Sequence, residues 1–248
     1  MTDTQIIILA AGHGKRMNNG DLPKVLVPIQ GKPMIQYVLD EIKQAGIDTN
    51  PIIVIGQKAD KVKATLGPSY RYILQKEQLG TGHAVACARD ICIGKADKIL
   101  VLYGDMPLIS AHTIQQLAQG PINKNATLSM ATIILPNFDS WYKSFIDFGR
   151  IIRDDKGNII RIVEKKDATP EEAASMEVNP NYLCFKNAWL WKNIDKLKNN
   201  NAQGEYYLTD LIKMACDQQE TITSIQIEPR EGIGVNSAEQ LRFAEQLL

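Results

Sequence analysis

Glycines, small residues and cations follow the first apolar run of this sequence, and together they could hold phosphate groups. Residues 6 to 17 read IIILAAGHGKRM. The loop after the run carries little side-chain bulk, so its backbone N–H groups are open to a ligand. Lys15, Arg16 and, after a proline, Lys24 add positive charge. This combination suits a polyphosphate, although a surface turn with solvated cations would contain the same residues.

Two familiar phosphate-binding motifs do not fit this loop. The dinucleotide fingerprint requires a third glycine, where Met17 stands, and an acidic residue at the end of the next strand, where Gly56 stands. The P-loop requires Gly-Lys-Ser/Thr, but Gly14-Lys15 is followed by Arg16. A phosphate site here must therefore be of another kind.

Asp105 is the most informative carboxylate of the chain. It directly follows KILVLYG (98 to 104), an apolar run that predicts a buried strand. Ligands of parallel sheets bind at the carboxyl ends of the strands, so Asp105 should face the ligand cleft. With cations nearby and no partner histidine, it is suited to be an oxygen ligand for Mg²⁺ that bridges phosphates. An aspartate that caps the next helix is the alternative.

The elements that position these residues alternate along the first half of the chain. Strands are expected over 6 to 10, 51 to 56 and 98 to 104, and helices over 33 to 46, 81 to 91 and 110 to 118. This alternation predicts a parallel sheet with helices on both faces. Further strands are expected over 126 to 135, 178 to 185 and near 221 to 227, a hairpin over 150 to 164, and a closing helix from Ser237.

Composition excludes several classes of protein. The 248 residues are 44% hydrophobic and contain no Gly/Ser linker, so we expect one folded domain over 1–248, with halves of about 1–120 and 121–248. The 28 basic and 28 acidic residues cancel, which favours neither nucleic acid nor a membrane surface. The four cysteines form no C-x-x-C pair and the three histidines no H-E-x-x-H motif, so zinc has no support. The N-terminal residues, MTDTQ, include no basic region of the kind that begins a signal peptide, and we expect a cytoplasmic protein.

Several segments resemble one family, the sugar-nucleotide pyrophosphorylases. ILAAGHGKRM (8 to 17) with LPKVL (22 to 26) resembles the signature loop of that family. The rest resembles the uridylyltransferase half of the bacterial bifunctional enzyme that makes UDP-N-acetylglucosamine. The matching segments are QKEQLGTGHA (75 to 84), LYGDMPLI (102 to 109), FGRI (148 to 151), IVEKKDAT (162 to 169), NNNAQGEYYLTDLI (199 to 212) and GVNS (234 to 237). The resemblance implies a Rossmann-like, GT-A-like nucleotidyltransferase fold, in which a mostly parallel mixed sheet has helices on both faces and a substrate-facing β-hairpin.

The resemblance also implies a role for each matching residue. The expected catalytic residues are Arg16, Lys24 and Asp105. The nucleotide is expected on Leu9, Ala10, Ala11, Gly12, Gly14 and Lys24, with its uracil read by Gln75, Gly80 and Thr81. An N-acetyl-sugar pocket is expected at Tyr103, Gly149, Glu164, Asn179, Tyr207 and Thr209. Asp105 and Asn236 match the pair that holds Mg²⁺, the implied cofactor.

In the implied reaction, an oxygen of N-acetylglucosamine 1-phosphate attacks the α-phosphorus of UTP and pyrophosphate leaves. A phosphate monoester is largely dianionic at neutral pH, so the reaction requires no general base. The alternatives are a uridylyl- or cytidylyltransferase for another sugar 1-phosphate, and a non-catalytic nucleotide-binding protein. The oligomeric state stays open.

The sequence departs from the family pattern in several places. The family's Asn-Thr-Gly is Asn179-Pro180-Asn181 here, which leaves the exact sugar open. Phe148 replaces a usual tyrosine, and the preceding segment, 136 to 147, looks different and longer. The chain stops at Leu248 without a hexapeptide repeat, so acetyl transfer and the trimer built by that domain are expected to be absent.

Overall fold

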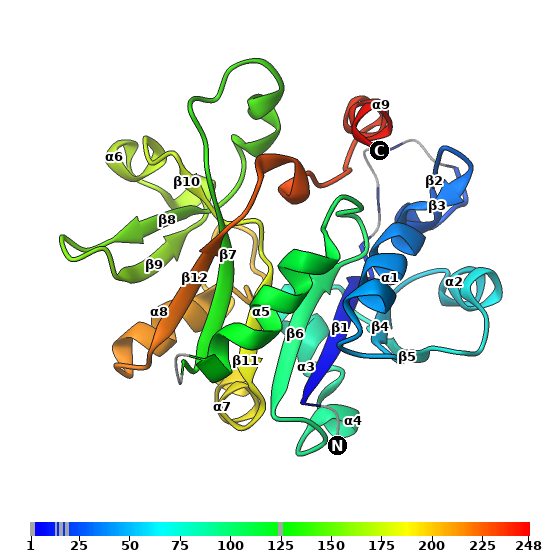
Figure 1. Ribbon diagram of the computed structural model, residues 1–248, viewed down its shortest axis with the longest axis horizontal. Coiled ribbons are helices and arrows are strands. Elements are labelled where there is room, and N and C mark those ends of the chain that lie inside the picture. Colours follow the sequence, from blue (N-terminus) through cyan, green and yellow to red (C-terminus); the bar gives the residue numbers. More distant parts are fainter. Residues whose placement is uncertain (1–2, 13, 15–16, 18–19, 124–125) are drawn as a thin grey trace.

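The computed structural model describes residues 3–12, 14, 17, 20–123 and 126–248 (Figure 1). The strands are β1 Thr4–Ala10, β2 Pro28–Ile29, β3 Lys32–Pro33, β4 Ile52–Ile55, β5 Arg71–Leu74, β6 Lys98–Tyr103, β7 Leu128–Ile134, β8 Arg150–Arg153, β9 Ile159–Val163, β10 Glu177–Val178, β11 Leu183–Lys186 and β12 Ile222–Gln226. The α-helices are α1 Met34–Ala45, α2 Ala59–Leu66, α3 Thr81–Ala86, α4 Arg89–Cys92, α5 Ala111–Asn123, α6 Pro170–Ala173, α7 Asn187–Asn193, α8 Asp210–Asp217 and α9 Ala238–Leu247. The 3-10 helices are η2 Lys24–Leu26, η3 Ser140–Phe145, η4 Lys165–Asp167, η5 Ile194–Lys196 and η6 Pro229–Gly232.

One sheet joins ten strands of the described residues, in the order β5-β4-β1-β6-β11-β7-β10-β8-β9, with β12 beside β7. The first four strands of this order are parallel to one another. Ile6, Ile7 and Ile8 of β1 are fully buried, as expected for a strand that is covered on both faces. Because parallel strands share a direction, the loops that follow β1, β5 and β6 meet at one edge of the sheet.

The second half of the sheet is mixed. β11 lies antiparallel between β6 and β7, and β10 lies antiparallel between β7 and β8. β8 and β9 form the predicted antiparallel hairpin at the far edge. Its turn is held by Asp154, whose Oδ1 accepts hydrogen bonds from the backbone N–H groups of Lys156 and Asn158, at 3.0 and 2.8 Å. The expected mixed, mostly parallel sheet with a hairpin is therefore confirmed.

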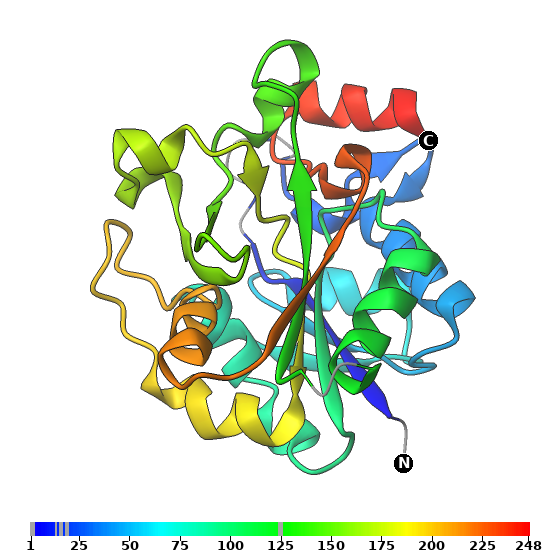
Figure 2. The same cartoon turned by 60° about the vertical axis from the view of Figure 1, so that its left-hand side comes forward.

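Helices cover both faces of this sheet. Figure 2 shows α5 on one side of β7 and β12, and α7 and α8 on the other. Ile6 and Ile8 of β1 join residues of α1 and α5 in one apolar cluster, whereas Ile7 and Leu9 join residues of α3, α7 and α8 in a second. Alternate residues of the strand thus supply opposite cores. Within the described ranges, no helix is long and apolar enough to cross a membrane.

A few elements differ from those predicted. The helical pattern over 81 to 91 forms two helices, α3 and α4. The strand expected over 178 to 185 is interrupted between β10 and β11, where Asn181 has a φ of +65°, which a strand cannot contain. Helix α2 was not predicted because Val62 is its one buried residue, so it lacks an apolar stripe.

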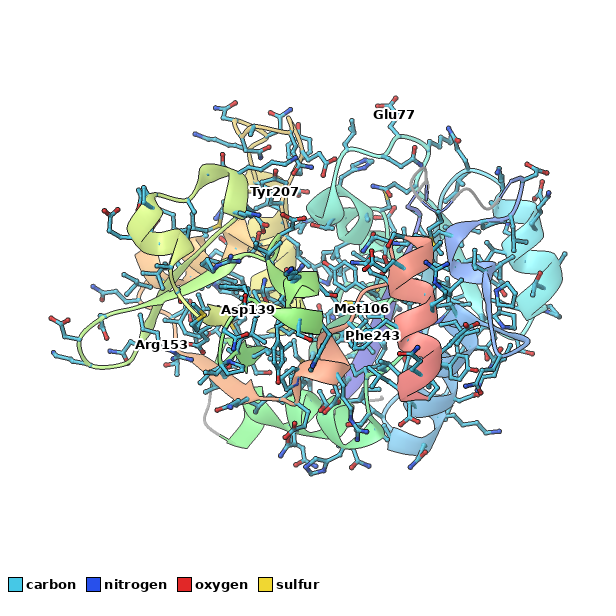
Figure 3. All side chains as sticks on the ribbon, turned by 90° about the horizontal axis from the view of Figure 1, so that it is seen from above. Glu77, Met106, Asp139, Arg153, Tyr207 and Phe243 are labelled. Carbon is cyan, nitrogen blue, oxygen red and sulfur yellow. The ribbon has the colours of Figure 1, made fainter. Side chains whose placement is uncertain are left out.

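The segment 136–147, which departs from the family pattern, packs against α9. The ring of Trp141 in η3 lies 5.4 Å from that of Phe243 in α9. Phe145, also in η3, is fully buried, and its ring lies 5.0 Å from that of Phe148. Figure 3 shows Asp139, which directly precedes η3, and Phe243 of α9 from above the molecule. This segment therefore supports the helix that directly follows Asn236 and Ser237.

Candidate active site

A cavity of about 410 Å³ lies at the carboxyl ends of the parallel strands. Leu9 is near the end of β1, Tyr103 ends β6, and Gln75 directly follows β5. The described lining is Leu9, Ala11, Gly12, Gly14, Lys24, Gln75, Gln78, Gly80, Thr81, Ala84, Tyr103, Asp105, Glu205 and Asn236. This is the edge at which open α/β sheets bind ligands, and the volume suits a small molecule.

Lys24 connects the polar groups on one side of the cavity. Its side-chain ammonium forms an ion pair with Asp105 and donates a hydrogen bond of 2.6 Å to Oδ1 of Asn236. The backbone carbonyl of Asp105 also accepts a bond of 2.9 Å from the N–H of Val235, which holds the neighbouring Asn236 in place. Lys24 is only 6% exposed. Three predicted residues from distant parts of the chain therefore converge on one point.

The oxygens of Asp105 and Asn236 are suited to hold a magnesium ion. Both side chains bond the same cation, the ammonium of Lys24, so their oxygens point to a common position. Carboxylate and amide oxygens are ligands that Mg²⁺ accepts, and the ion often uses one or two protein ligands together with substrate phosphates and water. The donor set therefore fits Mg²⁺.

Two glycines allow the loops of the cavity to pack closely. Gly14 has a φ of +62°, and a Cβ atom there would lie 2.8 Å from Cβ of Lys24. Gly80 has a φ of +108°, and a Cβ atom there would lie 2.7 Å from the carbonyl oxygen of Tyr206. Another residue at either position would be strained and would displace its neighbour. The glycines predicted to approach a ligand thus also set the position of Lys24 and of the 75–84 loop.

The loop that contains Gln75 and Gly80 is bonded to the segment 199–209. The N–H of Tyr206 donates to the carbonyl of Leu79, and the N–H of Gly82 donates to the carbonyl of Tyr206, both at 2.8 Å. Oγ1 of Thr81 accepts a bond of 3.0 Å from the N–H of Leu208. Two of the segments that resemble the family therefore form one side of the cavity together.

Most of the predicted sugar-pocket residues form a separate cluster in the mixed half of the sheet. The hydroxyl of Thr209 donates to Oε1 of Glu164 at 3.1 Å, and that oxygen would lie 3.4 Å from a Cβ atom at Gly149. The carbonyl of Gly149 accepts a bond of 2.9 Å from the N–H of Asn179. Burial raises the pKa of Glu164. These four residues lie together, although they are outside the described lining of the cavity.

Tyr103 lies between the cavity and this cluster. It lines the cavity, and its pKa is raised by burial and, to a smaller extent, by the negative charges of Asp105 and Glu164. Tyr207 has a buried hydroxyl that bonds no group in the described part of the protein. Burial raises the pKa of Tyr207 to about 12. An unpaired buried hydroxyl is costly, so that of Tyr207 is suited to bond a polar ligand.

The amide of Asn179, which was expected to bond the sugar, is engaged with Asn181. Asn179 is fully buried, and its Nδ2 donates to Oδ1 of Asn181. Its Oδ1 accepts a bond of 2.9 Å from the N–H of Asn181. Asparagine tolerates the φ of +65° at position 181 better than most residues, and the glycine of the family pattern would adopt it freely. The departure from the family pattern therefore closes a hydrogen-bonded loop over the Asn179 amide.

The cavity brings together most of the residues that were predicted to bind the nucleotide and the metal. Ala10 is buried at the end of β1 and does not belong to the described lining, and Arg16 lies outside the described residues. Gln78, Ala84 and Glu205 line the cavity but were not predicted. Each lies inside a segment that resembles the family, and only this location in the sequence could have indicated that these residues line the cavity.

Arg150 is a buried cation that the sequence did not single out. It is 2% exposed, and its guanidinium donates to the carbonyl of Phe148, to that of Ile146 at 3.0 Å and to that of Ala173 at 3.2 Å. Burial lowers the pKa of Arg150. Arg150 therefore holds the turn that leads into Gly149, beside the predicted sugar pocket.

Comparison with known proteins places the chain among enzymes that use nucleoside triphosphates. Residues 6–203 match the MobA-like NTP transferase domain. The chain is 40% identical to the bifunctional protein GlmU of Brevibacillus brevis over 99% of this chain and 51% of that protein. GlmU of Clostridium novyi is 42% identical over 98% of this chain and 51% of that protein. GlmU of Enterococcus faecalis is 40% identical over 100% of this chain and 52% of that protein. The chain thus spans about half the length of these curated relatives.

Solved structures show the same fold at lower identity. A Bacillus anthracis structure with bound sucrose, described as a glucose-1-phosphate thymidylyltransferase, superposes with a TM-score of 0.77 at 23% identity over 98% of this chain and 94% of that one. A UDP-glucose pyrophosphorylase with bound UDP-glucose superposes with a TM-score of 0.78 at 19% identity over 100% and 98% of the two chains. The fold and the predicted resemblance are both confirmed: the chain belongs to the MobA-like NTP transferase domain family and is a nucleotidyltransferase.

Proposed function

We propose that this chain is a Mg²⁺-dependent uridylyltransferase that forms UDP-N-acetylglucosamine and pyrophosphate from UTP and N-acetylglucosamine 1-phosphate. The observation that carries the proposal is the convergence of Lys24, Asp105 and Asn236 at one side of a cavity whose other side carries Gln75 and Thr81. A cation beside two oxygen ligands suits a polyphosphate, and a buried amide suits a base. The similarity to GlmU over nearly the whole chain supports this assignment.

In this proposal, the protein's task is to bring two polyanions together. An oxygen of the sugar 1-phosphate forms the new bond to the α-phosphorus of UTP, while the bond from that phosphorus to the pyrophosphate oxygen breaks. Lys24 would leave its present partners to contact the phosphates and stabilise the charge that gathers there. The binding site would align the two substrates for in-line displacement, which removes the entropic cost of their encounter. Mg²⁺, when held by Asp105 and Asn236, would supply further charge neutralisation.

We assign the sugar to the cluster of Gly149, Glu164 and Thr209, on the other side of Tyr103 from the phosphates. The carboxylate of Glu164 would accept a hydrogen bond from a sugar hydroxyl, and the unpaired hydroxyl of Tyr207 could bond another. On this basis one nucleotidyltransferase domain over 1–248 has a nucleotide half, about 1–120, and a sugar half, about 121–248. A different N-acetylated sugar is the second candidate because the Asn179 amide is bonded to Asn181.

A panel of sugar 1-phosphates, incubated with UTP and Mg²⁺ under pyrophosphate detection, tests the proposal. We expect the fastest release with N-acetylglucosamine 1-phosphate, the product identified by mass spectrometry, and loss of activity when a chelator removes the metal. Faster turnover of another sugar would overturn the sugar assignment while leaving uridylyl transfer in place. No release with any sugar 1-phosphate would overturn the proposed reaction.

A further inference from the structure

The side-chain amide nitrogen of Gln75 contacts two polar groups, the carbonyl of Gly80 and the ring of His83. Its Nε2 donates to the carbonyl oxygen of Gly80 at 3.2 Å and contacts Nδ1 of His83 at 3.1 Å. Gln75 is only 3% exposed. An amide nitrogen has two hydrogens, and these two neighbours use both of them when Nδ1 of His83 carries no proton.

This orientation leaves the amide oxygen as the group that a ligand can meet. Gln75 lines the cavity, and no group of the described residues donates to its Oε1. Rotating the amide by half a turn would place Oε1 against the carbonyl of Gly80 and against Nδ1 of His83. The carbonyl of Gly80 can only accept, so the rotated amide would lose that bond and gain a repulsive contact there. A second bond would be lost at Nδ1 when that nitrogen carries no proton.

His83 fixes this orientation only in one of its neutral forms. To accept a bond from Gln75, Nδ1 must be without a proton, so the proton must be on Nε2. Nε2 lies 3.9 Å from Sγ of Cys87, which is a weak acceptor. His83 itself is not among the residues that line the cavity in the described structure. It therefore acts on a ligand only through Gln75.

We propose that His83 is a positioning residue that sets base specificity, by holding Gln75 with its oxygen toward the base. An amide oxygen accepts a hydrogen bond from the N3–H of uracil or thymine. Cytosine has an acceptor at N3, and it would leave two acceptors facing each other in a buried site. This inference rests on the proposed function, because it requires a pyrimidine nucleotide in the cavity. It gives the physical reason for a preference for UTP over CTP.

Nucleotide binding without a sugar substrate separates this proposal from the proposed reaction. The dissociation constants of UTP and CTP with Mg²⁺ are measured by calorimetry for the native protein and for three variants. His83→Ala removes the acceptor. His83→Asn can restore it, because its Oδ1 lies near the position of Nδ1. His112→Ala, at an exposed position of α5, is the matched control.

We expect the native protein to prefer UTP by about 10²-fold, the scale of a buried mismatched acceptor. In His83→Ala this preference should fall by about tenfold, mainly through weaker UTP binding, since one of the two bonds that fix the amide is lost. His83→Asn should recover most of the preference, and His112→Ala should keep all of it. Equal losses for UTP and CTP in His83→Ala would overturn the proposal, because they would show a merely structural role.

A second measurement leaves both Gln75 and His83 unchanged. Nitrogen-15 NMR of the native protein at about pH 8, where imidazoles are ordinarily neutral, should show His83 with a bare Nδ1 and a protonated Nε2. Single substitutions of the other two histidines assign the signal. A protonated Nδ1 would overturn the proposal. Equal affinity of the native protein for UTP and CTP would also overturn it while leaving nucleotidyl transfer intact, whereas binding of neither nucleotide would overturn the proposed function as well.

Discussion

Replacing Lys24 with methionine should lower turnover far more than it weakens substrate binding. Methionine keeps the length and much of the volume of the side chain but removes its charge. In the structure that charge is paired with Asp105 and with Oδ1 of Asn236, at the side of the cavity assigned to the phosphates. Negative charge accumulates there most strongly in the transition state, so the ammonium is worth most at that stage.

The size of the effect follows from contact distance and burial. Nζ of Lys24 already lies 2.6 Å from an oxygen of Asn236, so a phosphate oxygen can take a similar place. Two unit charges about 4 Å apart interact by about 4 kcal/mol at an effective dielectric constant of about 20, and this corresponds to about 10³ in rate. Removing one preorganised donor typically costs about 10²–10³ in kcat. We therefore expect a loss of this order, with limited screening because Lys24 is 6% exposed.

The assay measures kcat and KM for both substrates by pyrophosphate release. Lys213→Met is the matched control, since Lys213 is exposed and pairs with Asp217 within α8. The control should behave like the native protein, and circular dichroism should show both variants folded. A Lys24→Met protein with near-native kcat and a raised KM would refute the reasoning, because Lys24 would then bind the ground state and the transition state equally.

Three further predictions concern the metal site, the sugar pocket and the buried arginine. Asp105→Asn should lower turnover by at least about 100-fold without unfolding the protein, whereas near-native activity with Mg²⁺ would contradict its role as a metal ligand. For the native protein, kcat/KM for N-acetylglucosamine 1-phosphate should exceed that for its C4 epimer by less than about 10⁴-fold. Asn181→Gly should increase this ratio, because it frees the Asn179 amide. A native ratio above about 10⁴ would show that the altered segment does not relax the pocket. Arg150→Met should reduce the free energy of unfolding, measured with urea, by about 3 kcal/mol because three carbonyls lose a buried donor. Exposed Arg242→Met is its control, and equal stability of the two variants would speak against this structural role.

Local patterns were sufficient to predict much of the fold. The isoleucines of β1 and the apolar run of β6 predicted buried parallel strands, and the polar turn after Arg153 predicted the hairpin. These elements form from interactions between near neighbours in the chain, which the sequence displays directly. Elements with few buried residues, such as α2, or with an unusual backbone, as at Asn181, could not be read in this way.

The arrangement of the site was decided by the tertiary structure. The sequence by itself determined which residue types were available: two glycine-rich loops, Lys24, and Asp105 after a buried strand. It could not show that Lys24 bonds both Asp105 and Asn236, which are 81 and 212 positions away, because that contact depends on how the sheet and α9 pack. Nor could it show that the Asn179 amide is bonded to Asn181, or that the amide of Gln75 contacts the ring of His83. Hydrogen bonds of this kind depend on distances of a few tenths of an ångström, and only the packed structure determines those distances.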